Sequence, residues 1–185
     1  MCEKIRCGWA GNDPIYVAYH DDEWGRAVHD DQKLFEFLVL EGMQAGLSWI
    51  TILKKREAFR IAFENFDPEK VSKFDESKIA ELMENKNIVR NHRKIVSAVK
   101  NAERFIEIQN KFGSFDDFFW RYTDRKTIIN HPKTLADIPA NSELSDKISR
   151  DLKKMGFSFV GSTIIYSFMQ AIGMVNDHLD DCAFK

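Results

Sequence analysis

Apolar side chains recur along most of this chain at spacings of three and four residues, which is the repeat of an amphipathic helix. Residues that can cap a helix stand before several of these runs, and glycines follow others. Only residues 15–19 alternate in hydrophobicity as a strand does, and a single stretch of five residues is too short to form a stable sheet. The fold class predicted is therefore all-α. Helices are expected around residues 34–40, 52–63, 77–84, 95–109, 115–122, 142–155 and 162–171, with a further short helix starting at Pro68 and a loop over 124–139.

Length and composition narrow the class of protein. The 185 residues carry 27 Lys and Arg against 29 Asp and Glu, and such a chain can bury about 70% of its surface in one domain spanning 1–185. A charged content of 30% and an aromatic content of 12% exclude a disordered or collagenous protein. No run approaches the roughly 18 apolar residues of a membrane span, and residues 1–9 lack the apolar core of a signal peptide. We expect a cytoplasmic protein with no membrane partner. Its formal net charge of −2 argues against binding polyanions over the whole surface but does not exclude a local basic face.

Cysteine and histidine residues gather near both ends of the chain. His178 and Cys182 are four positions apart, so a helix or tight turn would point both side chains the same way. Cys7 and His20 form a looser pair at the other end, and two thiolates with two imidazoles would complete a tetrahedral zinc site. Neither half-site is a Cys-x-x-Cys pair, so four unrelated polar residues are the alternative. Cys2 is a further thiol that could compete with Cys7.

Two glycines, Gly156 and Gly161, bracket a short turn between two predicted helices. Gly161 lets the backbone come close to a partner, and the helix beginning near Ser162 offers free N–H groups at the positive end of its dipole. Lys153 and Lys154 add positive charge just upstream. The pattern indicates a phosphate-binding hairpin, and an ordinary hairpin of two helices with glycine caps is the alternative.

Glu41 lies one helical turn beyond Phe37 and therefore on the apolar face of its predicted helix. A carboxylate there is costly unless a partner or a ligand needs it. An acid among aromatic rings suits a flat, cationic or electron-poor ring, which would stack and donate its N–H groups. The alternative is that Glu41 pairs with a Lys or Arg while the aromatic residues fill the core. The aromatic residues near it in sequence or by helical turn are Trp9, Tyr16, Tyr19, Trp24 and Trp49.

Leu47 is predicted at the tip of a short loop, because Gly46 ends one helix and Ser48 can cap the next. An exposed apolar side chain at a loop tip is what a protein needs to fill a base stack that it has opened. A residue that packs just before the next helix is the alternative.

Taken together, these stretches resemble the DNA-3-methyladenine glycosylase I family nearly end to end. The resemblance implies a helix-hairpin-helix DNA glycosylase fold, with two helical lobes around a base-binding pocket and a zinc site joining the N- and C-termini. Many relatives in the wider superfamily carry a Val-Asp-x-His segment whose Asp assists cleavage. Asn176 stands at that position here and Asp177 is displaced by one residue, so we do not assign Asp177 that role. The matching stretches are residues 7–9, 13–16, 19–25, 40–49, 156–161, 166–171 and 175–178.

The resemblance also implies an activity and the residues that carry it. The enzyme would flip 3-methyladenine out of double-stranded DNA and remove it by hydrolysis, and we expect a monomer that leaves the strand uncut. A catalytically silent DNA-binding module and a zinc-stapled protein-interaction domain are the alternatives. The residues expected in these roles are Glu41 as the catalytic acid that recognises the base, Trp9, Tyr16, Tyr19 and Trp49 around the base, Leu47, Gly156, Gly161 and Ser162 against DNA, and Cys7, His20, His178 and Cys182 on a structural Zn²⁺.

Overall fold

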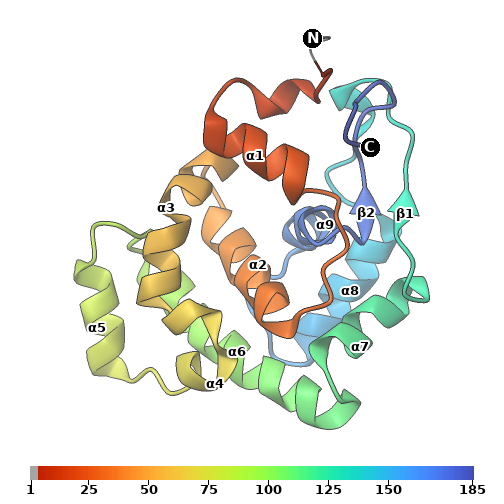
Figure 1. Ribbon diagram of the computed structural model, residues 1–185. Coiled ribbons are helices and arrows are strands. Elements are labelled where there is room, and N and C mark those ends of the chain that lie inside the picture. The colour runs from red at the N-terminus through yellow and green to blue at the C-terminus, as the bar shows by residue number, and fades with distance from the viewer. Residues whose placement is uncertain (1–3) are drawn as a thin grey trace.

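Helix α2 (Asp31–Gln44) runs through the middle of the computed structural model, which describes residues 4–185, and the other helices pack around it (Figure 1). Its N-terminus is capped by Asp30, whose carboxylate accepts a hydrogen bond of 2.8 Å from the backbone N–H of Lys33. Ten of its fourteen residues are buried, among them Glu36 and Glu41. A central helix covered on all sides therefore carries two acids into the interior.

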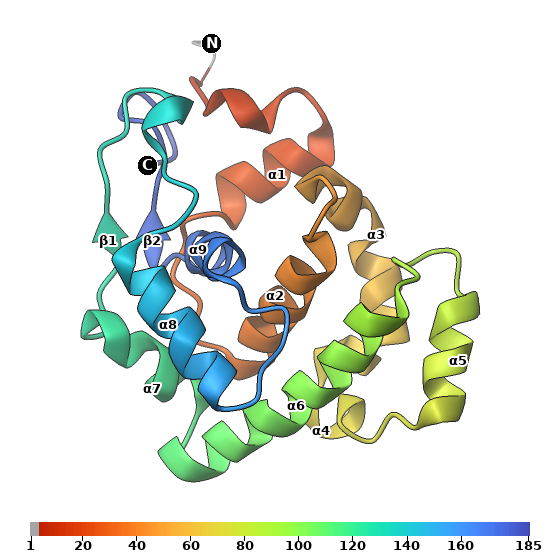
Figure 2. The same cartoon turned by 180° about the vertical axis from the view of Figure 1, so that it is seen from behind.

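Two groups of helices flank α2 (Figures 1 and 2). α1, α3, α4 and α5 lie on one side, α7, α8 and α9 on the other, and α6 passes along the end away from the chain termini and leads into α7. The helices around α2 span Pro14–Asp22 (α1), Trp49–Ala62 (α3), Pro68–Val71 (α4), Glu76–Glu84 (α5), His92–Phe112 (α6), Phe115–Trp120 (α7), Glu143–Lys154 (α8) and Ser162–Ala171 (α9). No helix within residues 4–185 is long and apolar enough to cross a membrane.

The all-α prediction is right for the helices but misses one parallel pair of two-residue strands. β1 (Ile128–Ile129) pairs with β2 (Val175–Asn176), and the pair attaches the predicted loop at 124–139 to the C-terminal segment. Strands this short leave no periodic signal in a sequence. Short 3₁₀ helices complete the described structure at Gly8–Ala10 (η1), Glu64–Phe66 (η2), Arg121–Thr123 (η3) and Leu135–Asp137 (η4).

The strand-like alternation at residues 15–19 lies within helix α1. Asp13 caps this helix through a hydrogen bond of 3.1 Å from the backbone N–H of Ile15, and Pro14 occupies the first turn. Proline favours that position because its fixed φ suits a helix and its missing N–H would have no partner there. The Asp-Pro start therefore outweighs a five-residue alternation.

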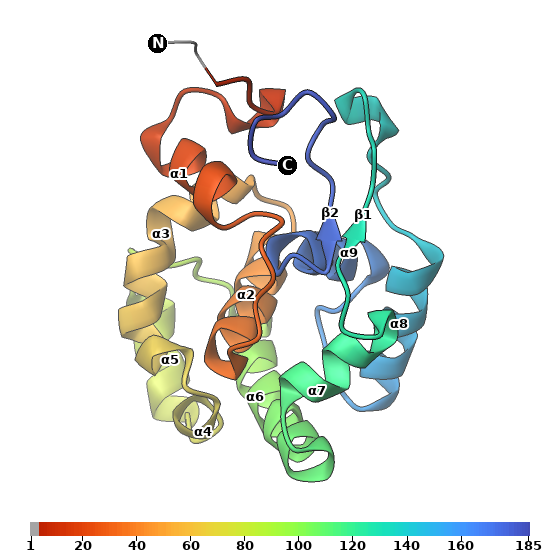
Figure 3. The ribbon, with the colours of Figure 1, turned by 45° about the vertical axis from the view of Figure 1, so that its right-hand side comes forward.

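Both ends of the described chain lie at the same end of the molecule (Figure 3). The backbone N–H of Ala183 donates to the carbonyl of Ile5 at 2.9 Å, which joins the last residues to the first described ones. This arrangement brings η1 and α1 together with the segment that follows β2 (Figure 3).

The connection between α1 and α2 crosses the end of α9 at very close range. The N–H of Val28 donates to the carbonyl of Ile172 at 3.0 Å. Gly173 follows with a φ of +69°, and a Cβ there would lie 2.2 Å from the backbone carbon of Arg26. Only glycine fits such a crossing. The crossing holds the connection between α1 and α2, which includes Trp24, against the end of α9.

Candidate active site

A cavity of about 340 Å³ lies where six elements meet, namely η1, α1, α2, α3, η4 and α9. Its size is in the range of small-molecule sites, and its lining combines aromatic rings with a few polar groups, as such sites commonly do. The side chains that line it are Trp9, Tyr16, Tyr19, Trp24, Glu41, Gln44, Trp49, Leu135, Ile138, Ser167 and Gln170.

Glu41 reaches this cavity from the fourth turn of α2 and is only 3% exposed. Its Oε2 atom is buried and has no hydrogen-bond partner. No ion pair joins Glu41 to a Lys or Arg among residues 4–185, so the structure does not support the alternative of a paired surface acid. Burial raises the pKa of this carboxyl to about 8. The free protein therefore holds a carboxyl group without a partner in the wall of the cavity.

Four of the expected aromatic residues surround this acid. The ring of Trp9 lies 5.0 Å from that of Tyr16 and 6.4 Å from that of Tyr19, centroid to centroid, and the rings of Tyr19 and Trp49 are 5.4 Å apart. Burial, followed by the charge of Glu41, raises the pKa of both tyrosines, so both phenols stay protonated. The indole Nε1 of Trp49 is buried and has no hydrogen-bond partner. The rings provide stacking surfaces together with polar atoms that are free to bind a ligand.

Leu47 lies at the tip of the turn between α2 and α3 and is 42% exposed, so it is not a buried staple residue. Gly46 adopts a φ of +80° in this turn, and the N–H of Leu47 donates to the carbonyl of Gln44 at 2.6 Å. Lys94 of α6 is buried beneath the turn, and its Nζ donates to the carbonyls of Met43 at 2.8 Å and Ala45 at 2.6 Å. The turn therefore holds an apolar side chain outward on a fixed support.

The predicted hairpin connects α8 to α9. Gly156 adopts a φ of +91° at the end of α8, and Gly161 is the N-cap of α9 with open space where a Cβ would lie. The hydroxyl of Ser162 donates to Asp146 and lies 2.8 Å from the hydroxyl of Ser145. A turn of the predicted form is present, with the Ser162 hydroxyl already engaged within the protein. Contact of these residues with DNA stays a prediction.

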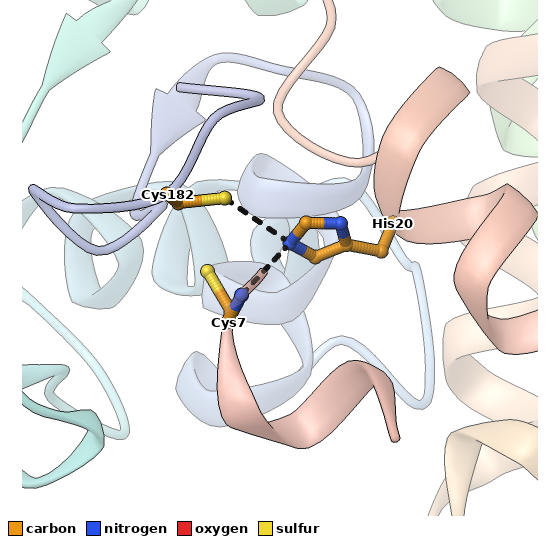
Figure 4. Close-up of side chains that lie close together, drawn as sticks. All are labelled: Cys7, His20 and Cys182. Carbon is orange, nitrogen blue, oxygen red and sulfur yellow. Dashed lines mark hydrogen bonds between the residues drawn. The ribbon is translucent and has the colours of Figure 1, made fainter. Parts of the chain in front are cut away.

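Three of the four expected metal ligands lie close together (Figure 4). The ligand atoms of Cys7, His20 and Cys182 are all buried and lie within 4.8 Å of one another. The His20 Nε2 atom is 3.6 Å from the Cys182 sulfur and accepts a hydrogen bond of 3.4 Å from the Cys7 N–H. Cys2 lies outside the described residues. Two thiols and an imidazole in contact make up most of the donor set that zinc prefers.

His178, the fourth expected ligand, lies beside this cluster but is not one of the three grouped ligands. Its ring centroid is 4.9 Å from that of His20, and its Nε2 is buried without a hydrogen-bond partner. Its Nδ1 lies 2.8 Å from the side-chain oxygen of Asn176, which requires the proton on Nδ1 and leaves the Nε2 lone pair free. Burial, followed by the charge of His20, lowers the pKa of His178 to about 4, so the ring is neutral. A neutral imidazole with a free lone pair fits a metal ligand.

Burial raises the pKa of the Cys7 thiol to about 12. A buried thiol of this kind stays protonated unless a cation stabilises the thiolate. The donor set around Cys7 therefore fits a metal site chemically.

Several residues of the cavity were not singled out from the sequence. Gln44 lies three residues after Glu41, and Ser167 and Gln170 lie three apart on α9, so helical spacing from a known site residue could have found them. Leu135 and Ile138 come from the 124–139 segment, where the sequence offers no periodicity. Trp24, which the sequence places in the aromatic cluster near Glu41, also lines the cavity.

Asp177 is buried behind the cavity, and its carboxylate is fully engaged. It accepts hydrogen bonds from Asn130 Nδ2 at 2.7 Å, Tyr166 Oη at 2.8 Å and Gln170 Nε2 at 2.7 Å. It is 1% exposed and is not part of the cavity lining within residues 4–185. Both carboxylate oxygens of Asp177 are therefore occupied by donors within the protein.

Comparison with known proteins shows which family this chain resembles. The family described as methyladenine glycosylase matches residues 9–185. A Haemophilus influenzae protein named DNA-3-methyladenine glycosylase is 46% identical over 180 residues, which cover 97% of either chain. The Escherichia coli K12 protein named DNA-3-methyladenine glycosylase 1 is 47% identical over 177 residues, which cover 96% of this chain and 95% of the relative.

Solved structures agree with the sequence relatives. A crystal structure of 3-methyladenine DNA glycosylase I, 46% identical, superposes with a TM-score of 0.94 over 97% of this chain and 98% of its own. The Staphylococcus aureus 3-methyladenine DNA glycosylase I, solved to explain 3-methyladenine recognition, is 38% identical with a TM-score of 0.94 over 97% of this chain and 96% of its own. A tyrosine-to-phenylalanine variant of a 3-methyladenine DNA glycosylase I was solved in complex with 3-methyladenine and matches equally well, at 38% identity and a TM-score of 0.94 over 97% of each chain. On the strength of this full-length match and of the shared architecture, the chain belongs to the methyladenine glycosylase family.

Proposed function

We propose that this protein is a DNA repair enzyme that removes 3-methyladenine from alkylated double-stranded DNA by hydrolysis. The observation that carries the proposal is the buried Glu41 carboxyl, whose unpartnered oxygen lies in a cavity walled by aromatic rings. An unpaired buried acid destabilises the free protein, so its presence is explained by a ligand that completes it. Relatives that carry this activity in their names support the assignment.

The chemistry follows from the charge of the substrate. An adenine methylated at N3 is cationic in DNA, so its bond to the sugar is already weak and cleavage needs no strong acid. The rings of Trp9, Tyr16, Tyr19 and Trp49 hold the extruded base by stacking, and Glu41 accepts hydrogen bonds from its N–H groups. Normal bases are excluded by cavity shape and by the lack of positive charge.

Bond cleavage then needs only water. The bond between base and sugar breaks with its electron pair leaving on the base, the cationic sugar adds a water oxygen, and the water proton is released. No lysine is among the described residues that line the cavity, so the sugar forms no Schiff base and the strand stays uncut.

The surfaces beside the cavity suit a duplex partner. The exposed Leu47 would fill the gap that the extruded nucleotide leaves. Gly156, Gly161 and Ser162 would lie against the phosphate backbone, with the exposed Lys153 and Lys154 adding charge. The two groups of helices that flank α2 would act as two lobes on either side of this pocket, and we expect a cytoplasmic monomer.

A structural zinc ion is part of this proposal. Cys7, His20, His178 and Cys182 would hold it, and four protein ligands leave no open position for a reacting water. Bound there, the ion would supply only a cross-link between the two ends of the chain. The free Nε2 of His178 and the contact between Cys7, His20 and Cys182 support it. The cross-link would keep Trp9 and the tyrosines of α1 in the cavity wall.

Release of free base from methylated duplex DNA tests the proposed function. The wild type should release 3-methyladenine, while Glu41→Gln should lower its single-turnover rate by roughly 100-fold or more, the scale of losing one preorganised electrostatic contact. Glu76→Gln, which changes an exposed acid on α5, serves as the matched control and should leave the rate unchanged. Circular dichroism of all three proteins checks that the fold is retained.

Two outcomes would contradict the proposal. Undiminished excision by Glu41→Gln would remove Glu41 from the mechanism. Binding of duplex DNA that weakens with salt but releases no base would identify a catalytically silent module instead.

A further inference from the structure

Gln170 is a cavity residue whose side-chain amide is held from behind by Asp177. The Asp177 carboxylate also accepts hydrogen bonds from Asn130 Nδ2 and Tyr166 Oη, at 2.7 and 2.8 Å. Because a carboxylate can only accept, Gln170 must turn its NH₂ group toward Asp177, where the distance is 2.7 Å. The orientation of the amide is thus set by chemistry and needs no ligand.

This orientation decides which polar atom Gln170 presents to a ligand. Asp177 does not belong to the cavity lining described for residues 4–185, whereas Gln170 does. With its NH₂ group engaged behind the wall, the amide oxygen is the polar atom of Gln170 left for the cavity. Glu41 lines the same cavity with an unpartnered carboxyl oxygen. The Gln170 oxygen therefore adds a hydrogen-bond acceptor to the cavity that Glu41 also lines.

Adenine and guanine differ at the position that such an acceptor would read. Adenine carries an exocyclic amino group at C6, which donates hydrogen bonds, and guanine carries a carbonyl oxygen there, which accepts them. A fixed oxygen acceptor attracts the first and repels the second. Sites built to hydrogen-bond one group reject analogues that lack it much more strongly than apolar pockets do.

We propose that Gln170, locked by Asp177, is a specificity-determining residue that accepts a hydrogen bond from the exocyclic amino group of the methylated adenine. The inference rests on the proposed function and deepens it. Asp177 then acts as a positioning residue, because it controls the amide without touching the base. Asp177, next to the position where the wider superfamily has its acid, would thereby contribute to base choice.

Product analysis from one methylated duplex tests this assignment. Wild type and Gln170→Met would be given the same DNA, and released 3-methyladenine and 3-methylguanine would be measured in single turnovers. Methionine keeps the length of the side chain but has no comparable acceptor, so the release of 3-methyladenine should fall roughly 10-fold to 100-fold. Release of 3-methylguanine should not fall, so the ratio of the two products collapses. Gln32→Met, which changes an exposed glutamine on α2, should keep the wild-type ratio.

A second measurement uses the unaltered protein, in case Gln170→Met fails to fold. Free 3-methyladenine should inhibit the wild type more strongly than 3-methylhypoxanthine, which carries an oxygen in place of the amino group, by at least 10-fold. Equal inhibition, an unchanged product ratio in Gln170→Met, or an equal fall of both products would each overturn the role of Gln170. Failure of the wild type to release any base would instead overturn the proposed function.

Discussion

The Glu41 carboxyl shows how one residue links burial to pH. Its pKa of about 8 in the folded protein lies well above the value of about 4.3 expected in the unfolded chain. Between those values the folded state holds a proton that the unfolded state has lost. The contribution of Glu41 to stability is therefore fully present below about pH 4.3 and is lost as the pH rises toward 8.

A comparison of variants measures this effect. The free energy of unfolding of Glu41→Gln relative to wild type should increase between pH 5 and 8, by at most about 1.4 kcal/mol per pH unit, because glutamine has no proton to lose. It should then level off above pH 8. Urea denaturation at a series of pH values would show this, and a difference that stays constant with pH would contradict the buried, unpaired state of Glu41.

Some residues of the site could be predicted from sequence and others could not. Glu41 could, because its spacing from Phe37 places it on the apolar face of a helix. Gln170 lies within a stretch that matches the family. Its proposed role depends on the hydrogen bond from its amide to Asp177, which no sequence pattern indicates. Leu135 enters the cavity from a segment whose path is set by the pairing of β1 with β2, a tertiary constraint without a local signal.

At the scale of elements, α6 supports the end of α2 through one buried lysine. Lys94→Met would remove both hydrogen bonds to the carbonyls of Met43 and Ala45, at a cost of roughly 1–3 kcal/mol in the free energy of unfolding. The turn that holds Leu47 would lose its support. We therefore expect slower excision from duplex DNA, while affinity for free 3-methyladenine is largely retained.

Lys100→Met is the matched control, since Lys100 is exposed on the same helix. Denaturant melts, single-turnover excision and titration with the free base would be measured side by side for both variants. If Lys94→Met loses duplex excision and free-base binding to the same degree, the lysine supports the whole cavity and has no particular role at the turn.

Elements with a clear start were the ones the sequence could predict. Ser114 before α7 and Ser142 before α8 both accept hydrogen bonds from the backbone of the first turn, as expected of N-caps. Helix α1 was obscured because its Asp13 cap precedes a stretch that also alternates in hydrophobicity. Sequence signals therefore predict a helix where the N-cap residue and the hydrophobic spacing agree, as in α7 and α8, and fail where they conflict, as in α1.

At the scale of the whole molecule, the proposed zinc site would tie the two ends of the chain together. We expect about one zinc ion per chain in protein purified without chelator, measured by elemental analysis. Cys182→Ser should lower both the zinc content and the Tm, because an ion bound only to the folded state stabilises it. Cys2→Ser should change neither, which separates the spare thiol from Cys7. Protein free of zinc with an unchanged Tm would count against the site.

The crossing at Gly173 carries a consequence for how this molecule could be altered in evolution or by design. The smallest possible side chain there would have to push two backbones apart, and the backbone it meets belongs to the connection that carries Trp24. A single methyl group there would displace the connection that carries Trp24, and Trp24 lines the cavity. Position 173 therefore accepts no side chain. Its glycine keeps the wall beside Gln170 at a fixed distance from the connection between α1 and α2.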